Sequence, residues 1–212
     1  PDHRHIHNHR GTPIAESWDF TRVGDVRVLG RFQSARTNLE AGRLDFFGVN
    51  FGLKLPTGER DIANGEGALA ERSLQPGSGT TDALVGGFFS QVLAQSESSW
   101  FVQTLAQTPL ASRDDYRPGN RYTLDLGYRY EASASVGLML QLNVLVRRRD
   151  RGAQAEPADS GGRFVHLSPG IGYALSKRTQ VYGFLQVPVY QRVNGVQLVA
   201  DWGALVGFTM RF

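Results

Sequence analysis

Four histidines alternate with other residues near the start of the chain: His3, His5, His7 and His9. In an extended segment, residues two apart point to the same side, so this spacing groups four imidazoles. Neutral imidazoles bind zinc, copper or nickel, and the segment is therefore a candidate transition-metal site. The alternative is a solvated polar loop, because no cysteine or carboxylate completes the site and the arginines nearby would repel a cation.

The rest of the chain offers no catalytic constellation. His166 is the only other histidine, so a Ser–His–Asp triad or a paired acid–base system has little support. Ser78 lies in the sequence PGSG, not in the G-x-S-x-G motif of a nucleophile elbow, and fits a turn. We therefore expect a protein that is not an enzyme and has no cofactor, apart from a metal at the histidine segment.

Strands are the elements expected to position the other polar residues. Residues 195–212 alternate apolar and other residues to the end of the chain. Strands average about 5–6 residues, whereas a transmembrane β-strand needs about 9–11. With Trp202 and Phe208 placed to face lipid and Phe212 as the last residue, the stretch resembles the terminal strand of bacterial outer-membrane β-barrels. The alternative is a long edge strand of a soluble β-sandwich.

The same alternation recurs upstream. It predicts strands at about 19–34, 43–55, 83–95, 100–108, 121–131, 136–147, 163–175 and 181–190. Pro169 and Pro188 each remove a backbone donor, so bulges are expected there. Short and long connections alternate along the chain, as the periplasmic turns and outer loops of such barrels do, except for a short turn near Asn194.

The expected fold class is therefore all-β: an antiparallel transmembrane β-barrel of about 10–12 strands, about nine of them in this chain. Residues 1–17 are expected to form a His-rich outer loop, and residues 18–212 the barrel. Bacterial single-chain barrels have even strand numbers and the last strand should end in the periplasm. Counting back predicts at least one strand before Pro1, from an upstream segment or another chain.

Residues opposite the apolar set are expected to line the lumen. These candidates are Arg121, Asp125, Arg129, Gln141, Asn143, His166, Tyr182, Phe184, Gln186, Tyr190, Asp201 and Arg211. The charged side chains would either line a polar pore or fill a closed lumen with salt bridges. The aromatic side chains suit stacking with an aromatic solute. Inward glycines such as Gly170 and Gly203 are expected to leave room.

Composition excludes several other classes of protein. The chain has 212 residues, no cysteine and a formal net charge of +3. This charge is too small to indicate nucleic-acid binding without a basic helix or a zinc pattern. The sequence has no run of about 18 apolar residues, so it predicts no transmembrane helix. The lack of cysteine fits a protein that crosses an oxidising periplasm.

Four short segments resemble the outer-membrane transporter family of the phenol-degradation (MetA) pathway. They are residues 23–25 (VGD), 52–58 (GLKLPTG), 74–82 (LQPGSGTTD) and 186–191 (QVPVYQ). The resemblance covers roughly residues 20–212 and implies a barrel that moves small, often aromatic or apolar, molecules. It assigns no binding residue.

Three functions follow as hypotheses. The leading one is a passive channel in the bacterial outer membrane, in contact with the bilayer, lipopolysaccharide and a small, partly apolar solute. The sequence has no nucleotide-binding loop, so flux would run down a gradient or take energy from a partner. The second is a structural barrel that sheathes or anchors another protein chain. The third is a metal-handling outer-membrane protein that uses the histidine segment.

Overall fold

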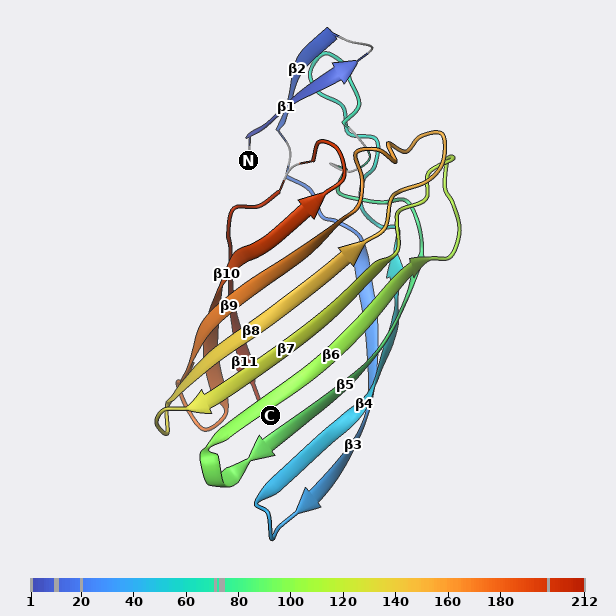
Figure 1. Ribbon diagram of the computed structural model, residues 1–212. Coiled ribbons are helices and arrows are strands. Elements are labelled where there is room, and N and C mark those ends of the chain that lie inside the picture. Colours follow the sequence, from blue (N-terminus) through green and yellow to red (C-terminus); the bar gives the residue numbers. More distant parts are fainter. Residues whose placement is uncertain are drawn as a thin grey trace.

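The computed structural model shows an all-β protein built on one nine-stranded antiparallel sheet (Figure 1). The structure describes residues 2–9, 12–19, 21–70, 72, 75–197 and 199–211, and for residues 2–19 it gives the strands alone. The sheet contains β3 (Val26–Asn38), β4 (Arg43–Leu55), β5 (Asp82–Leu93), β6 (Ser98–Pro109), β7 (Arg121–Glu131), β8 (Val136–Arg147), β9 (Gly162–Ala174), β10 (Thr179–Val193) and β11 (Gly203–Met210). The nine strands in this sheet confirm the expected number.

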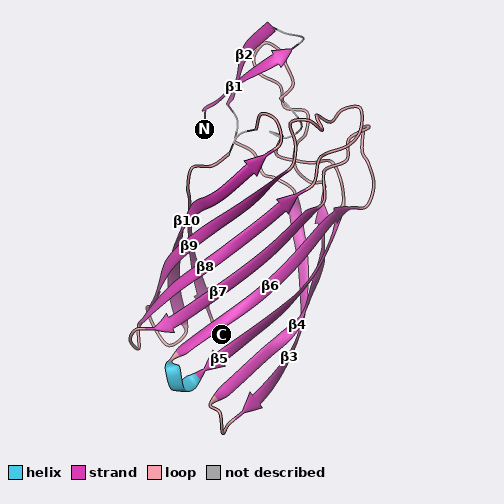
Figure 2. Ribbon diagram, viewed as in Figure 1, coloured by secondary structure: helices cyan, strands magenta, loops and turns pink. Residues whose placement is uncertain are grey.

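Each strand of the sheet pairs with its neighbour in the sequence, in the order β11 to β3. The sheet curls like an incomplete cylinder in Figure 1. Among the described residues, no strand pairs with the outer edge of β3 or of β11, so the sheet is not closed. The one helical element of the described chain is the short η1 (Ala94–Ser96), and no described helix is long and apolar enough to span a membrane (Figure 2).

Long and short connections leave opposite ends of the strands, as expected (Figure 2). Residues 39–42, 94–97, 132–135 and 175–178 make short turns, whereas 56–81, 110–120, 148–161 and 194–202 make longer loops. The connection after β10 is therefore not the expected exception. We call the two ends of the sheet the short-turn end and the long-loop end.

The two faces of the sheet show reversed burial compared with a soluble protein: the apolar face is exposed and the polar face is buried. Apolar side chains such as Phe32 (66% exposed), Phe51 and Leu140 (46%) point outward and are exposed. Lys54 and Ser168, in contrast, are buried on the inner face. The buried hydrophobic residues of the described chain are few: Ala70, Leu84, Phe88 and Tyr116. Soluble domains bury their apolar face. This sheet instead places an apolar surface outside and a polar surface inside.

The start of the last strand differs from the sequence prediction. The last strand begins at Gly203, not near residue 195, because the preceding residues bond to another loop. Gln197 Nε2 donates to Gly161 O at 2.8 Å, and Val196 N donates to Asp159 Oδ1 at 2.8 Å. These bonds hold residues 194–197 away from β10.

The two proline predictions have different outcomes. The β9–β10 register shifts between Pro188 and Tyr190, which confirms one bulge. Pro169 lies opposite Leu140 of β8, and neither the β8–β9 register nor the β9–β10 register shifts at this position. The bulge expected at Pro169 is therefore wrong.

The beginning of the chain forms a sheet of its own. β1 (Asp2–His9) and β2 (Thr12–Asp19) pair antiparallel, with His5 opposite Glu16 in the register. Within the stretch that the sequence predicted as an outer loop, residues 1–17, the described residues are thus paired strands, and the outer location stays a prediction. The side chains of the four alternating histidines lie outside the described residues, so the metal site stays a prediction.

Candidate functional site

The inner face carries a cavity of about 510 Å³ halfway along the strands. Its lining comes from five strands: Arg31 of β3, Phe88 and Ser90 of β5, Phe101 and Gln103 of β6, Asp125 of β7, and Gln141 and Asn143 of β8. Because four other strands lie between β3 and β8 in the sheet, the curvature of the sheet is what brings their side chains to one cavity. Three of the sequence candidates, Asp125, Gln141 and Asn143, therefore lie together.

Hydrogen bonds between neighbouring strands fix the polar lining of this cavity. Asn143 Nδ2 donates to Asp125 Oδ1 at 2.9 Å, and Ser168 Oγ donates to Asn143 Oδ1 at 2.7 Å. Asn50 Nδ2 donates to Gln103 Oε1 at 3.4 Å on the other side. The registers place Gln103 opposite Asp125 and Asp125 opposite Asn143. A belt of amide, hydroxyl and carboxylate groups thus crosses the inner face.

Aromatic rings complete the lining. The guanidinium carbon of Arg31 lies 3.5 Å from the centroid of the Phe88 ring, a cation–π contact. The ring of Phe101 covers Gly127, where any Cβ would collide with it. The ring of Phe184 covers Gly170 in the same way. These glycines seat aromatic rings and do not leave open space, so the expectation of room at Gly170 is wrong.

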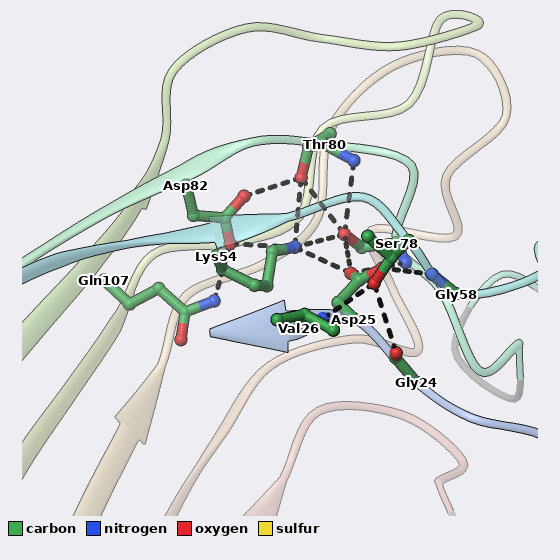
Figure 3. Close-up of polar contacts among 10 residues, drawn as sticks. Gly24, Asp25, Val26, Lys54, Gly58, Ser78, Thr80, Asp82 and Gln107 are labelled. Atoms are coloured by element: carbon green, nitrogen blue, oxygen red, sulfur yellow. Dashed lines mark hydrogen bonds and ion pairs between the residues drawn. The ribbon is translucent and has the colours of Figure 1, made fainter. Parts of the chain in front are cut away.

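A second polar group lies at the long-loop end and centres on Lys54 (Figure 3). We call it the Lys54 cluster: Asp25, Lys54, Ser78, Thr80, Asp82 and Gln107. Lys54 Nζ lies 3.1 Å from Asp25 Oδ2 and 3.1 Å from Asp82 Oδ2, and it also contacts Ser78 Oγ. The side chains of Lys54 and Asp82 are only 5% and 1% exposed. An ammonium group buried this deeply needs such partners, because desolvation without them is costly.

The remaining bonds of the cluster tie three distant segments together. Ser78 donates through its backbone N and its Oγ to Asp25 Oδ2, at 3.0 and 2.8 Å. Thr80 Oγ1 donates to Asp82 Oδ1 at 2.7 Å, and Gln107 Nε2 donates to Asp82 Oδ2 at 2.5 Å. Asp25, Lys54 and Ser78, one from each of three segments singled out in the sequence, therefore meet at this point (Figure 3).

The protonation state of Asp25 reflects these bonds. Burial alone would raise the pKa of its carboxyl, but the hydrogen bonds from Ser78, Gly58 and Lys54 together hold it below the ordinary value of 3.8. With Ser78 donating to Asp25 and Lys54 paired to two carboxylates, the cluster is a closed network. Its bonds fasten Ser78 and Thr80 of the long loop to Asp25 and to Asp82 at the start of β5.

Further charges surround a hollow of about 230 Å³ beside the cluster. Arg121 and Arg147 lie opposite each other in the β7–β8 register and both line it. Arg147 Nη2 donates to Asp150 Oδ2 at 2.8 Å, and Tyr116 Oη donates to the same atom at 2.9 Å. Burial first, and then the charge of Asp150, raise the pKa of the Tyr116 hydroxyl. Charged side chains thus occupy part of the space enclosed by the sheet at its long-loop end.

Other sequence candidates lie on the inner face but do not line the cavity. Arg129 Nε donates to Glu131 Oε1 at 2.5 Å, and its Nη1 and Nη2 lie 2.9 and 2.8 Å from the Gln180 amide oxygen once that amide is turned toward it. His166 lies opposite Asn143 in the register. The rings of Tyr182 and Phe184 meet edge to face, with centroids 6.2 Å apart.

Four further candidates have separate outcomes. Gln186 lies opposite Gly203 on the inner face. Tyr190 lies opposite Val165, on the outer face, because the bulge after Pro188 moves it there. Asp201 precedes β11 and is exposed. Arg211 follows the end of β11 at the short-turn end. Tyr190, Asp201 and Arg211 are thus not inner-face strand residues.

Several site residues carried no clear signal in the sequence. Phe88 and Phe101 belong to strands whose two faces are both rich in apolar residues, so alternation does not show which face is inward. Ser78 was interpreted as a turn residue, and its bond to Asp25, 53 positions away, has no local signature. Among the residues with described side chains, no group of three or more metal-ligating side chains occurs.

Comparison with models of known protein families and with curated proteins gives no match to this chain. The chemistry of the site therefore follows from its own residues. The cavity offers hydrogen-bond donors and acceptors, one carboxylate, one guanidinium and two aromatic rings. This combination suits reversible contact with a small molecule that has both polar and apolar parts.

Proposed function

We propose that this chain forms the wall of a bacterial outer-membrane β-barrel that passes small, partly apolar or aromatic solutes through its interior. The observation that carries the proposal is the reversed burial of the sheet. An exposed apolar face is stable in contact with lipid, and a polar inner face is stable against water or a polar solute. In this proposal the protein is a passive channel and has no enzymatic activity.

The position of aromatic side chains on the outer face supports a membrane location. On β7, Tyr122 lies near the long-loop end and Tyr130 near the short-turn end, and both are exposed. The eight residue steps between them span about 26 Å at about 3.3 Å per residue. Strand tilt shortens this span, which remains comparable to the apolar band of about 25 Å in outer-membrane barrels, flanked by aromatic girdles.

The short-turn end has further groups suited to a membrane interface. Trp100 Nε1 donates to Gln91 Oε1 at 3.2 Å, and Gln91 Nε2 donates to Asp45 Oδ1 at 2.8 Å. The Trp100 ring lies 5.2 Å from the Phe89 ring, centroid to centroid. Tryptophan with a satisfied N–H is enriched where lipid meets water. The bilayer and lipopolysaccharide are accordingly the proposed surroundings of the outer face.

The proposal requires the two edges of the sheet to be paired. An unpaired backbone edge in hydrocarbon costs several kcal/mol for each polar group, so lipid tolerates closed barrels only. The edges of β3 and β11 would pair with each other or with further strands, including those of a second protein chain. Ten to twelve strands in total would leave a lumen between that of a small filled barrel and that of a porin.

The proposed path runs through the cavity that Asp125, Gln141 and Asn143 line. Phe88 and Phe101 offer aromatic faces, and the amide belt offers hydrogen bonds to a hydroxyl group. The resemblance of segments 23–25, 52–58 and 74–82 to a family that handles phenolic compounds supports the same solute class. Charged side chains at the long-loop end would set the width of the entrance.

A flux assay tests this proposal. Liposomes that contain the purified protein should take up a phenolic solute faster than empty liposomes, and faster than they take up a sugar. Gln141→Trp places a large ring in the cavity and should slow the phenolic solute, whereas Leu140→Trp, one residue along on the lipid face, should not. Equal effects of the two variants would contradict the proposed path.

The second candidate function is a structural barrel that holds a partner chain. The observation that favours it is the extent of filling on the inner face: rings cover Gly127 and Gly170, and the Lys54 cluster closes its own network. Absence of flux for every solute, together with a tightly copurifying protein, would support this candidate over a channel.

A further inference from the structure

We propose that the arginines at the long-loop end of β8, β9 and β10 form a binding site for the phosphate groups of a lipid headgroup. A hollow of about 770 Å³ lies there. Six arginines line it: Arg147, Arg148, Arg149, Arg151, Arg163 and Arg192. No aspartate or glutamate is among its lining residues. We call these six side chains the arginine rim.

Most of this positive charge has no ion-pair partner within the described part of the chain. Arg147 pairs with Asp150, with Nη2 to Oδ2 at 2.8 Å. For Arg148, Arg163 and Arg192, no ion pair with a described carboxylate occurs, and all three are exposed. Guanidinium groups bind the oxygens of phosphate or carboxylate through two parallel hydrogen bonds, so an unpaired group of them is suited to oxyanions such as phosphate.

The strand register gives an independent reason to expect an anion. Arg163 of β9 and Arg192 of β10 are directly opposite each other. Two like charges in this position destabilise a strand pair, and a bound anion between them would remove the repulsion. Val146 lies opposite Arg163 on the other side and also borders the hollow.

The surface next to the arginine rim indicates an amphiphile and not a free anion. Moving from the rim toward the middle of the sheet, the outer face presents Tyr190 and Val165, which are opposite each other, and then Leu142 and Leu167, also opposite each other. Phosphates would bind at the rim while acyl chains lie along this apolar stripe. The lipid identity rests on the proposed membrane location, whereas phosphate binding itself does not.

Binding of lipid A to the purified full chain in detergent tests the proposal independently of any flux. Diphosphorylated lipid A should bind more tightly than its monophosphorylated form. R163Q/R192Q should lower the affinity about 25-fold, because each arginine near an anionic headgroup contributes about fivefold. K177Q/R178Q removes the same charge at the opposite, short-turn end and should leave the affinity unchanged.

Two further measurements keep the result decisive. R163K/R192K keeps the charge but loses the bidentate geometry, so its affinity for lipid A should lie between those of the wild type and R163Q/R192Q. The circular dichroism spectra of all variants should be equal. Equal affinity in R163Q/R192Q and wild type, or an equal loss in K177Q/R178Q, would overturn the site. If inorganic phosphate competes as strongly as lipid A, the rim is a free-anion site and the lipid assignment is wrong. A lack of flux in liposomes alters neither result.

Discussion

Lys54 of β4 and Asp82 of β5 lie directly opposite each other, and the 3.1 Å contact between Nζ and Oδ2 is almost completely buried. The same ammonium group also pairs with Asp25, which precedes β3. One lysine thus joins the first three strands of the sheet and the long loop between β4 and β5.

Replacement of Lys54 by methionine should destabilise the protein strongly. The change leaves the carboxylates of Asp25 and Asp82 close together without their shared cation. Breaking a buried ion pair by removing one partner costs about 3–5 kcal/mol. Urea-induced unfolding from liposomes would measure the change in the free energy of unfolding. Lys177→Met, at an exposed turn, is the matched control and should be within about 0.5 kcal/mol of the wild type.

The hold of the cluster on the long loop should weaken in acid. The folded pKa of Asp25 lies below its ordinary 3.8, so ionised Asp25 stabilises the folded state above that value. This stabilisation is lost as the pH falls below about 3.8 and through the folded pKa. Hydrogen exchange of residues 75–80, corrected for intrinsic rates, should therefore accelerate from pH 5 to pH 3. In Asp25→Asn it should be fast at both pH values; pH-independent protection in the wild type would contradict the role of this carboxylate.

The strands of the sheet were largely predictable because alternation is a local property. The predicted ranges 43–55, 121–131 and 136–147 match β4, β7 and β8. The last strand was predicted too long because alternation does not report which partner is available, and Gln197 and Val196 bond to the 159–161 loop. Tyr190 changed face because one extra residue after Pro188 reverses the alternation beyond it.

The site was less predictable, because its contacts are between residues far apart in sequence. Alternation along 43–55 places Lys54 opposite the apolar set, but its pairing with Asp25 depends on how a 26-residue connection, 56–81, folds back. The glycines facing inward were visible in the sequence, whereas the rings that cover them belong to neighbouring strands. Strand patterns therefore assign a face to a side chain but not the neighbour that fills the space beside it.

Leu140 and Gln141 provide a direct test of the two faces. Leu140→Arg should destabilise assembly in lipid by about 2–4 kcal/mol, the cost of arginine at the middle of the bilayer on a barrel surface. Gln141→Arg should be tolerated, because position 141 lines the inner cavity. Folding yield into liposomes, read from the heat-dependent shift on gels, would compare them. Similar yields would mean that the outer face does not meet lipid.

The packing of Phe101 on Gly127 predicts an unusual cost for a small substitution. Gly127→Ala should destabilise by about 1–3 kcal/mol, since the new methyl group collides with the ring. All three nearest atoms belong to that side chain, so Phe101→Ala in the same protein should recover part of the loss. A double-mutant cycle with urea unfolding would measure this coupling; additive losses would mean that the ring does not occupy this position.

Asp125 should set the charge selectivity of the proposed path. It is the one carboxylate among the described residues that line the cavity, and its position is fixed by the bond from Asn143. A unit charge about 8 Å from a permeating ion, at an effective dielectric constant of about 40, contributes about 1 kcal/mol, or about fivefold in relative permeability. Asp125→Asn should therefore lower the ratio of cation to anion permeability about fivefold, measured as a reversal potential across a planar bilayer under a salt gradient. Asp201→Asn, which removes the same charge outside the sheet, should have a much smaller effect. If the two variants shift the potential equally, ions do not pass Asp125, and a protein with no conductance at all would favour the structural barrel.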